Sequence, residues 1–299
     1  MRVASLILAS LAVVYAAPTQ APTSHKPGKS LPVDWKLLSQ AAGLSQQTYC
    51  FFQPDNQTVG DAQLLYEYGD GNLDQRAIVF KSKSLGIAVS FEGTEPISIA
   101  SILHDADFQL VNPDKDLKEV FPPGVQVFKG FQDAYLAVAR PVLGKVKEMM
   151  QKYNETRVTV TGHSLGAAMA LLAAAHYEQT LKDGSVANVF TFGQPRTGNP
   201  AFANAMDDKF LGKLFYVVNG QDWVPHMPPR DWNFQHPSGQ VWINPPNSQN
   251  WTFFPGQEDS NGANSVDPIW TFQDHHGYYF HTGLGHGPGK CPATVNDHE

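Results

Sequence analysis

"VTVTGHSLGAAMALL", residues 158–172, is the stretch that decides the fold class of this chain. Its first half predicts an apolar β-strand, and its second half is apolar all round, which predicts a buried helix. Between them lies Gly162-His163-Ser164-Leu165-Gly166, which matches the G-x-S-x-G pattern of a serine on a sharp strand-to-helix turn. We therefore expect Ser164 at the apex with its hydroxyl exposed. Residues 162 and 166 are expected to be small because larger side chains would collide there.

Strands and helices alternate on both sides of this turn. "AIVFKS" and "GIAVSF" are rich in β-formers and flank a short polar turn, which predicts a hairpin. No internal repeat or linker follows residue 33, so we expect residues 34–299 to form a single domain. The other expected elements are helices at 34–50, 130–153 (with an irregularity before Pro141), 164–184 and 199–210, and strands at 157–162, 185–193 and 213–220. This alternation predicts an α/β fold with a mostly parallel central sheet and helices on both faces.

A serine nucleophile needs a base, and the base needs an orienting carboxylate. His163 is expected to be a packing residue of the turn, because a sequence neighbour points away from Ser164. Asp222 follows the strand expected at 213–220, and open α/β sheets place their sites at the carboxyl ends of strands. The alternative is an aspartate that caps a turn, since "NGQD" is turn-like. Asp231 and Asp267 also compete, but neither follows a clear strand.

The base is expected in the C-terminal stretch "DHHGYYFHTGLGH", residues 274–286, which holds four histidines. His275 and His276 are adjacent and cannot both point into one cleft from an extended segment. A metal site is the alternative use of such a cluster. The stretch lacks H-E-x-x-H or similar spacing, and we expect neither a metal nor a cofactor.

At this point the chain resembles the fungal class 3 lipases, a family that also includes feruloyl esterases. The resemblance runs from about residue 34 to 291. It rests on several motifs in order: "SFEGT" (90–94), "VFKGFQDAY" (127–135), "VTGHSLGAAMA" (160–170), "TFGQPRTGNPAFA" (191–203), "VVNGQDWVPHMPP" (217–229) and "HGYYF" (276–280).

The resemblance implies an α/β-hydrolase-like fold and a catalytic triad of Ser164, Asp222 and His276. His276 is favoured because Tyr279 and Phe280 follow it at the family's spacing, and His275 is the alternative. The resemblance also implies an oxyanion hole. Its two donors are the backbone N–H groups of Thr94 and Leu165, and losing one such donor typically lowers turnover about 10²–10³-fold.

Two features depart from the family's pattern. Glu92 stands where many relatives have Arg, and an inward carboxylate would oppose charge developing beside Thr94. We expect Glu92 to be held in a salt bridge or turned outward. The stretch 95–108 is expected to carry a short lid helix, in which Ile99, Ile102 and Leu103 have helical spacing. Such a helix could cover an apolar cleft in water and open at a lipid surface, which favours a lipase over a feruloyl esterase.

The chain is expected to be secreted. Met1-Arg2, an apolar run and small residues near Ala16 predict a signal peptide at 1–16, with a membrane anchor as the alternative. Residues 17–33 are rich in Pro, Ser and Thr and predict a leader or propeptide. Cys50 and Cys291 are the two cysteines and are expected to form one disulfide, the alternative being two buried thiols. Sequons at Asn56, Asn154 and Asn250 predict glycosylation.

The predicted function is that of a secreted serine ester hydrolase, favoured as a triacylglycerol lipase that works through an acyl-enzyme. The substrate is expected to be a lipid ester at an oil–water interface, met by a monomer through transient interfacial binding. The net charge of −7 argues against nucleic acid as a partner. The alternatives are a feruloyl esterase or other carboxylesterase of the same fold, and a non-catalytic binding relative.

Overall fold

The computed structural model describes residues 31–51, 57–71, 75–94 and 109–295. The predicted signal peptide, most of the predicted leader, the predicted lid helix at 95–108 and the sequon at Asn56 lie outside the described residues. Among the residues that are described, no helix has the length and apolar character needed to span a membrane.

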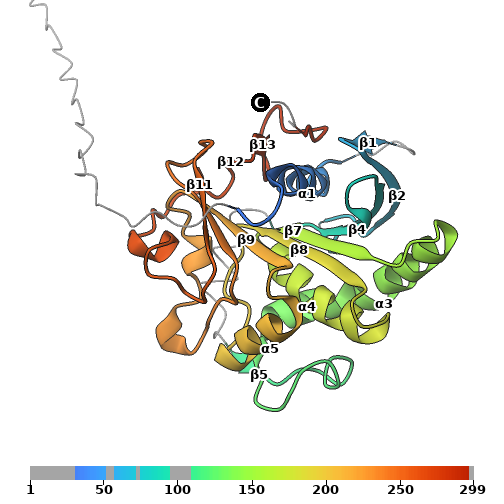
Figure 1. Cartoon of the computed structure of the whole chain (residues 1–299), viewed down its shortest axis with the longest axis horizontal. Coiled ribbons are helices and arrows are strands. Elements are labelled where there is room, and N and C mark those ends of the chain that lie inside the picture. Colours follow the sequence, from blue (N-terminus) through green and yellow to red (C-terminus); the bar gives the residue numbers. More distant parts are fainter. Residues whose placement is uncertain (1–30, 52–56, 72–74, 95–108, 296–299) are drawn as a thin grey trace, which may run out of the picture.

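A nine-stranded sheet forms the centre of the molecule (Figure 1). Its five middle strands run parallel, in the order β4, β7, β8, β9 and β10, and the pairs outside them are antiparallel. The prediction of a mostly parallel central sheet is confirmed for this middle part. In chain order the strands are β1 (Thr58–Val59), β2 (Ala62–Tyr68), β3 (Ala77–Ser82), β4 (Gly86–Phe91), β7 (Val158–His163), β8 (Val186–Phe192), β9 (Leu214–Asn219), β10 (Gln240–Ile243) and β11 (Trp251–Phe254).

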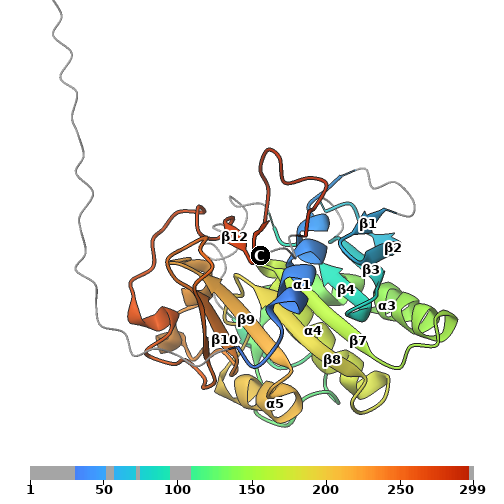
Figure 2. The ribbon, with the colours of Figure 1, turned by 45° about the horizontal axis from the view of Figure 1, so that its top comes forward.

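Helices cover both faces of this sheet, as predicted. In Figures 1 and 2, α1 (Trp35–Gln47) lies on one face, and α3 (Lys129–Lys152), α4 (Leu165–Thr180) and α5 (Pro200–Phe210) lie on the other. Two apolar cores result, because each face of a buried sheet must be covered by apolar side chains. α4 is buried almost throughout, which agrees with its nearly continuous apolar sequence.

The remaining elements are short and belong mostly to the connections around the sheet. β5 (Leu110–Val111) pairs with β6 (Val127–Phe128), and β12 (Tyr278–Tyr279) pairs with β13 (Thr282–Gly283). The described residues also form 3₁₀ turns at Val224–His226, Arg230–Trp232 and Ala263–Ser265.

The two ends of the described chain are joined. Cys50 follows α1 and bonds to Cys291, with 5.5 Å between their Cα atoms, so the predicted disulfide is confirmed. The bond closes a loop of 241 residues, for which the chain-entropy model gives roughly 5 kcal/mol of stabilisation. Its consequence for the site is that α1 and the C-terminal segment with β12 and β13 lie side by side.

The structure differs from the predicted elements in the outer strands of the sheet and at Pro141. Strands β1, β2, β10 and β11 lie on either side of the five predicted strands and carry no strict alternation of buried and exposed residues that would predict them. Pro141 lies inside α3, which continues through it from Lys129 to Lys152. The missing N–H of this exposed proline is therefore tolerated without ending the helix.

Candidate active site

The turn at Ser164 is tight and strained. Ser164 joins β7 to α4 with φ 59° and ψ −126°, a conformation that side-chain-bearing residues seldom adopt. A Cβ on Gly162 would lie 2.3 Å from the carbonyl oxygen of Gly166, and a Cβ on Gly166 would lie 2.1 Å from that of Phe91. Only glycine fits either position, as the sequence predicted, so the backbone close-packing of the turn fixes where Ser164 stands.

Ser164 itself is fully buried, which differs from the expectation of an exposed hydroxyl. The loop after β4 passes directly over it: a Cβ on Gly93 would lie 2.9 Å from the Cβ of Ser164. Within the described part of the chain, Ser164 Oγ has no hydrogen-bond partner. The hydroxyl is thus held in a dry environment where a hydrogen bond to an incoming group would be unscreened by water.

Asp222 lies at the carboxyl end of β9, as predicted, and is fully buried. Its Oδ1 accepts a hydrogen bond from the backbone N–H of Val224 at 3.0 Å, which anchors the carboxylate to the 3₁₀ turn that follows. Its Oδ2 accepts from His275 Nδ1 at 2.8 Å and from the Tyr279 hydroxyl at 3.4 Å. The Val224 N–H and the Tyr279 hydroxyl both donate to the carboxyl group, which fixes its position beside His275.

The histidine that is hydrogen-bonded to Asp222 is His275, whereas the sequence favoured His276 for this place. Residues 272–276 form a turn in which the His276 N–H donates to the Phe272 carbonyl at 2.8 Å, so the segment is not extended as assumed. In this turn the ring of His275 faces Asp222. The ring of His276 stacks on it at 5.2 Å between centroids, and a Cβ on Gly285 would lie 2.5 Å from that ring.

The sequence preference for His276 over His275 has an identifiable source. Tyr278-Tyr279-Phe280 places an aromatic pair three and four residues after His275, and another three and four residues after His276. In the structure Tyr279 decides between them, because its hydroxyl donates to the His275 carbonyl at 3.2 Å and reaches Asp222. Asp222 therefore has one histidine and one tyrosine as partners from the same short segment.

The hydrogen bond to Asp222 fixes the tautomer of His275. A carboxylate can only accept, so Nδ1 carries the proton and Nε2 presents its lone pair. His275 is fully buried, and its Nε2 has no hydrogen-bond partner within the described residues. A buried serine hydroxyl and a buried imidazole nitrogen that both lack partners are the two reacting groups that an acyl-transfer site requires.

Gly193 allows the histidine to approach the sheet. It follows β8 with φ 54°, and a Cβ there would lie 2.8 Å from the His275 ring and 3.2 Å from Asp222 Oδ2. Sequence reasoning did not identify this glycine, although the phrase "TFG" at the end of a strand was a signal for a close backbone approach.

The predicted oxyanion donors lie at the edges of the same turn. Leu165 is the first residue of α4, where backbone N–H groups lack intrahelical partners and the helix dipole favours negative charge. Thr94 follows Gly93, the residue that covers Ser164, and its hydroxyl is buried with no hydrogen-bond partner in the described structure. Both residues are thus near the nucleophile on separate chain segments.

Glu92 does not face the nucleophile as an isolated charge. It is 3% exposed, and its Oε2 lies 3.8 Å from Arg76 Nε, which also lies 3.0 Å from Glu67 Oε1. The Arg76 guanidinium further donates to the backbone carbonyls of Thr48 and Cys50. The expected salt bridge is present, and Glu92 shares Arg76 with Glu67.

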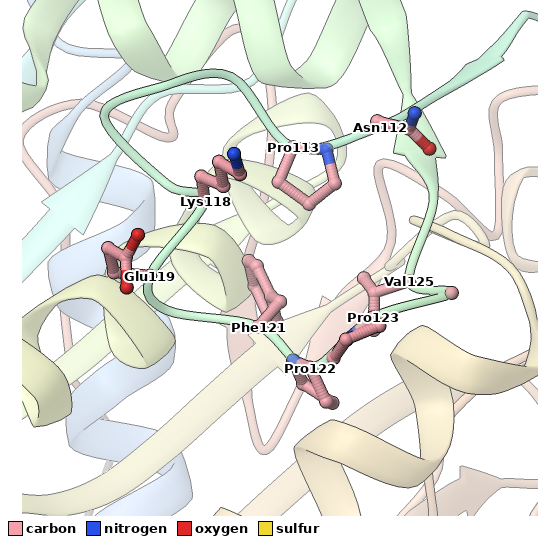
Figure 3. Close-up of a pocket in the computed structure, with 9 residues that line it drawn as sticks. Asn112, Pro113, Lys118, Glu119, Phe121, Pro122, Pro123 and Val125 are labelled. Atoms are coloured by element: carbon pink, nitrogen blue, oxygen red, sulfur yellow. The ribbon is translucent and has the colours of Figure 1, made fainter.

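Other candidate sites in the described structure do not involve these residues. No group of three His, Cys, Asp or Glu side chains there could hold a metal ion. A surface cavity of about 490 Å³ is lined entirely by the loop between β5 and β6, including Pro113, Lys118 and Phe121 (Figure 3). Asn154 and Asn250, which the sequence predicts to carry glycans, are exposed.

Comparison with known proteins points to one family. A model for "Lipase (class 3)" matches residues 88–232. A secreted mono- and diacylglycerol lipase of Malassezia restricta is 51% identical over 290 residues, which cover 97% of this chain and 96% of that protein. A secreted mono- and diacylglycerol lipase of Malassezia globosa is 45% identical over 298 residues, which cover 98% of each chain.

Solved structures agree with this at the level of fold. A lipase from Rhizopus microsporus var. chinensis superposes with a TM-score of 0.73 at 27% identity, covering 88% of this chain and 92% of that one. A Yarrowia lipolytica lipase superposes with a TM-score of 0.76 at 22% identity, covering 88% and 98%. The predicted α/β-hydrolase-like fold is confirmed.

Histidines whose pKa is lowered in the folded protein make its stability depend on pH. Burial lowers the pKa of His276 to about 2 and that of His236 to about 4, and it lowers the pKa of His163 well below its ordinary value. The unfolded chain binds protons at these histidines below about pH 6.5, whereas the folded chain does not. Stability should therefore fall as the pH drops from 6.5 towards 4.

The variant His276→Gln isolates one of these groups. Urea unfolding at several pH values between 4 and 7 gives the slope of the unfolding free energy against pH. This slope should be smaller in the variant than in the wild type, by the equivalent of about one proton taken up on unfolding. Other titrating groups contribute equally to both proteins and cancel. An unchanged pH dependence in the variant would mean that the folded protein does not hold His276 in its neutral form between pH 4 and 7.

Proposed function

Because this chain belongs to the class 3 lipase family, we propose that it hydrolyses acylglycerols through Ser164, His275 and Asp222. The chain is a secreted lipase, hence a carboxylic ester hydrolase. The observation that carries the assignment of the triad is the 2.8 Å hydrogen bond between His275 and Asp222, made at the carboxyl end of the sheet beside a strained, buried serine.

The reaction follows from the tautomer of His275. Its Nε2 takes the proton of Ser164 as Oγ attacks the ester carbonyl carbon, and the carbonyl electron pair moves to oxygen. The resulting oxyanion is received by the N–H groups of Leu165 and Thr94. Asp222 stabilises the imidazolium that forms, because the pair is buried.

Collapse of the tetrahedral intermediate completes the first half. The electron pair on the oxyanion re-forms the carbonyl double bond, and the bond from carbon to the alcohol oxygen breaks. His275 gives its proton to that oxygen. The acyl group is then bonded to Ser164. Water repeats the sequence with His275 as base, and the fatty acid and the free serine are released.

The relatives support a proposal for the substrate class. The two relatives that are 51% and 45% identical over nearly the whole chain are named for mono- and diacylglycerols. We therefore propose partial glycerides as the preferred substrate, with the triacylglycerol that the sequence alone favoured as the alternative. The feruloyl ester alternative has no support among these relatives.

An exposed tryptophan that stacks on a buried one beside the site supports binding at a lipid surface. Trp270 and Ile269 are 61% and 47% exposed, and the Ile269 N–H donates to the carbonyl of Gln221, next to Asp222. Trp270 stacks on buried Trp223 at 5.1 Å. Exposed tryptophans favour the boundary between lipid and water, so this edge brings the site to its substrate.

The catalytic groups also support a monomer. Ser164, Asp222 and His275 come from a single chain, and their positions depend on one sheet that spans residues 58–254. The same sheet supports the assignment of residues 34–299 to one catalytic domain. No second copy is needed to complete the site.

The two adjacent histidines give the sharpest test of the triad. His275→Ala should lower kcat on p-nitrophenyl butyrate by about 10³-fold or more, as should Ser164→Ala, because base and nucleophile act as a unit. His276→Ala is the matched control and should keep the rate within about tenfold, since it removes a neighbouring ring and leaves the base in place. Loss of activity in His276→Ala with full activity in His275→Ala would overturn the assignment.

A substrate panel tests the acyl specificity. Emulsified diolein, monoolein and triolein, together with methyl ferulate, are supplied at equal ester concentration, and fatty or ferulic acid release is titrated. Diolein and monoolein should be hydrolysed fastest. Faster hydrolysis of triolein would restore the triacylglycerol assignment, and faster hydrolysis of methyl ferulate would exclude the acylglycerol one.

Binding to the lipid surface can be measured without turnover. In the Ser164→Ala background, Trp270→Ala should weaken partitioning onto diolein emulsions by about tenfold, because a bulky aromatic anchor is lost. Leu211→Ala is the control: Leu211 is 69% exposed and precedes β9, whereas Asp222 follows it. Equal partitioning of the two variants would show that this edge does not contact lipid.

A further inference from the structure

His163 is the residue through which nucleophile and base are connected. It ends β7, directly before Ser164, and it is fully buried. Its Nε2 lies 2.9 Å from the backbone carbonyl oxygen of His275, and the two imidazole rings are 4.5 Å apart. A single peptide unit therefore separates the nucleophile from a side chain that is hydrogen-bonded to the main chain of the base.

The hydrogen-bond partners of His163 determine which of its ring nitrogens carries the proton. A carbonyl oxygen only accepts, so Nε2 carries the hydrogen and donates to His275. Nδ1 must then accept, and its partner is the hydroxyl of Tyr49 at 2.6 Å. Burial lowers the pKa of His163 well below its ordinary value, and the neighbouring imidazoles of His275 and His276 lower it further. The ring therefore stays neutral and keeps one donor and one acceptor.

The carbonyl of His275 is held from two directions. His163 donates to it from the end of β7, and Tyr279 donates to it at 3.2 Å from the segment that carries His275. Tyr49, which orients His163, directly precedes Cys50 and hence the disulfide to Cys291. The hydrogen bonds thus join the segment after α1, the strand before Ser164 and the C-terminal loop at one point.

We propose that His163 is a positioning residue, which sets the distance and angle between Ser164 Oγ and His275 Nε2 by holding the His275 main chain. This rests on the proposed triad. His163 itself takes no part in proton transfer, since both of its nitrogens are occupied by Tyr49 and by the carbonyl. Its contribution is geometric, and a displacement of about 1 Å at a reacting group can cost about 10²-fold in rate.

Two variants of His163, with amide side chains of different length, distinguish this positioning role from simple packing. In His163→Gln, the amide nitrogen can reach the position of Nε2 and donate to the His275 carbonyl. In His163→Asn, the shorter side chain reaches only the position of Nδ1 and loses that donor. Both variants replace an aromatic ring by a neutral amide, so they share the loss of ring packing.

The measurement is kcat and KM on p-nitrophenyl butyrate, together with the rate at which a phosphonate ester labels Ser164. His163→Gln should keep kcat within about threefold of wild type. His163→Asn should lower both kcat and the labelling rate by at least about tenfold with KM little changed, because the reacting groups are misaligned while the substrate still binds. Thermal unfolding of both variants shows whether their stabilities are matched.

A third variant keeps the proposal testable if neither the Gln nor the Asn variant folds. Tyr49→Phe retains the ring and removes only the hydroxyl that orients His163, so kcat should fall several-fold at unchanged KM. Equal kcat in the Gln and Asn variants, or a loss of kcat that follows only the melting temperature, would overturn the proposal. Failure of the triad has a different signature, which is activity in His275→Ala.

Discussion

The close contact between the backbones of Gly162, Gly166 and Phe91 is the constraint on which the rest of the site depends. These contacts leave no room for a Cβ, and they bring the ends of β4 and β7 and the start of α4 together. Ser164 must then take a strained conformation that the surrounding sheet and helix hold in place. The same contact sets the position of Gly93 above the serine and of the N–H groups at the start of α4.

Around that turn, buried polar groups are held in place by hydrogen bonds. Asp222 and His275 are both fully buried, and their mutual hydrogen bond is supported by Val224 and Tyr279. His163 and the carbonyl of His275 belong to the same arrangement. A buried polar network of this kind is costly if any member lacks a partner, and that cost makes the geometry specific. Within the described residues, Ser164 Oγ and His275 Nε2, which we propose react with substrate, have no hydrogen-bond partner.

Much of this arrangement could be predicted from the sequence, for reasons that lie in local patterns. The elbow around Ser164, the position of Asp222 after a strand and the disulfide between Cys50 and Cys291 each follow from a short motif or from the cysteine count. The choice between His275 and His276 could not be made in this way, because Tyr278, Tyr279 and Phe280 offer the aromatic pair to both.

What settles that choice is tertiary structure. The turn at 272–276 and the hydroxyl of Tyr279 orient His275 towards a carboxylate that is 53 residues away in the chain. The burial of Ser164 and the roles of Tyr49 and Gly193 likewise depend on segments that meet only after folding. Strands β10 and β11 do not follow from the sequence pattern, because their burial is set by neighbouring elements rather than by alternation.

The most direct test of the account is a crystal structure of the protein inactivated by an alkyl phosphonate ester, which mimics the tetrahedral intermediate. The proposed triad and oxyanion hole predict a covalent bond from phosphorus to Ser164 Oγ and a phosphonyl oxygen at the N–H groups of Leu165 and Thr94. They also predict that His275 Nε2 faces the serine oxygen while Nδ1 stays on Asp222. An adduct in which His276 occupies that place, or in which phosphorus is bonded to another residue, would contradict them.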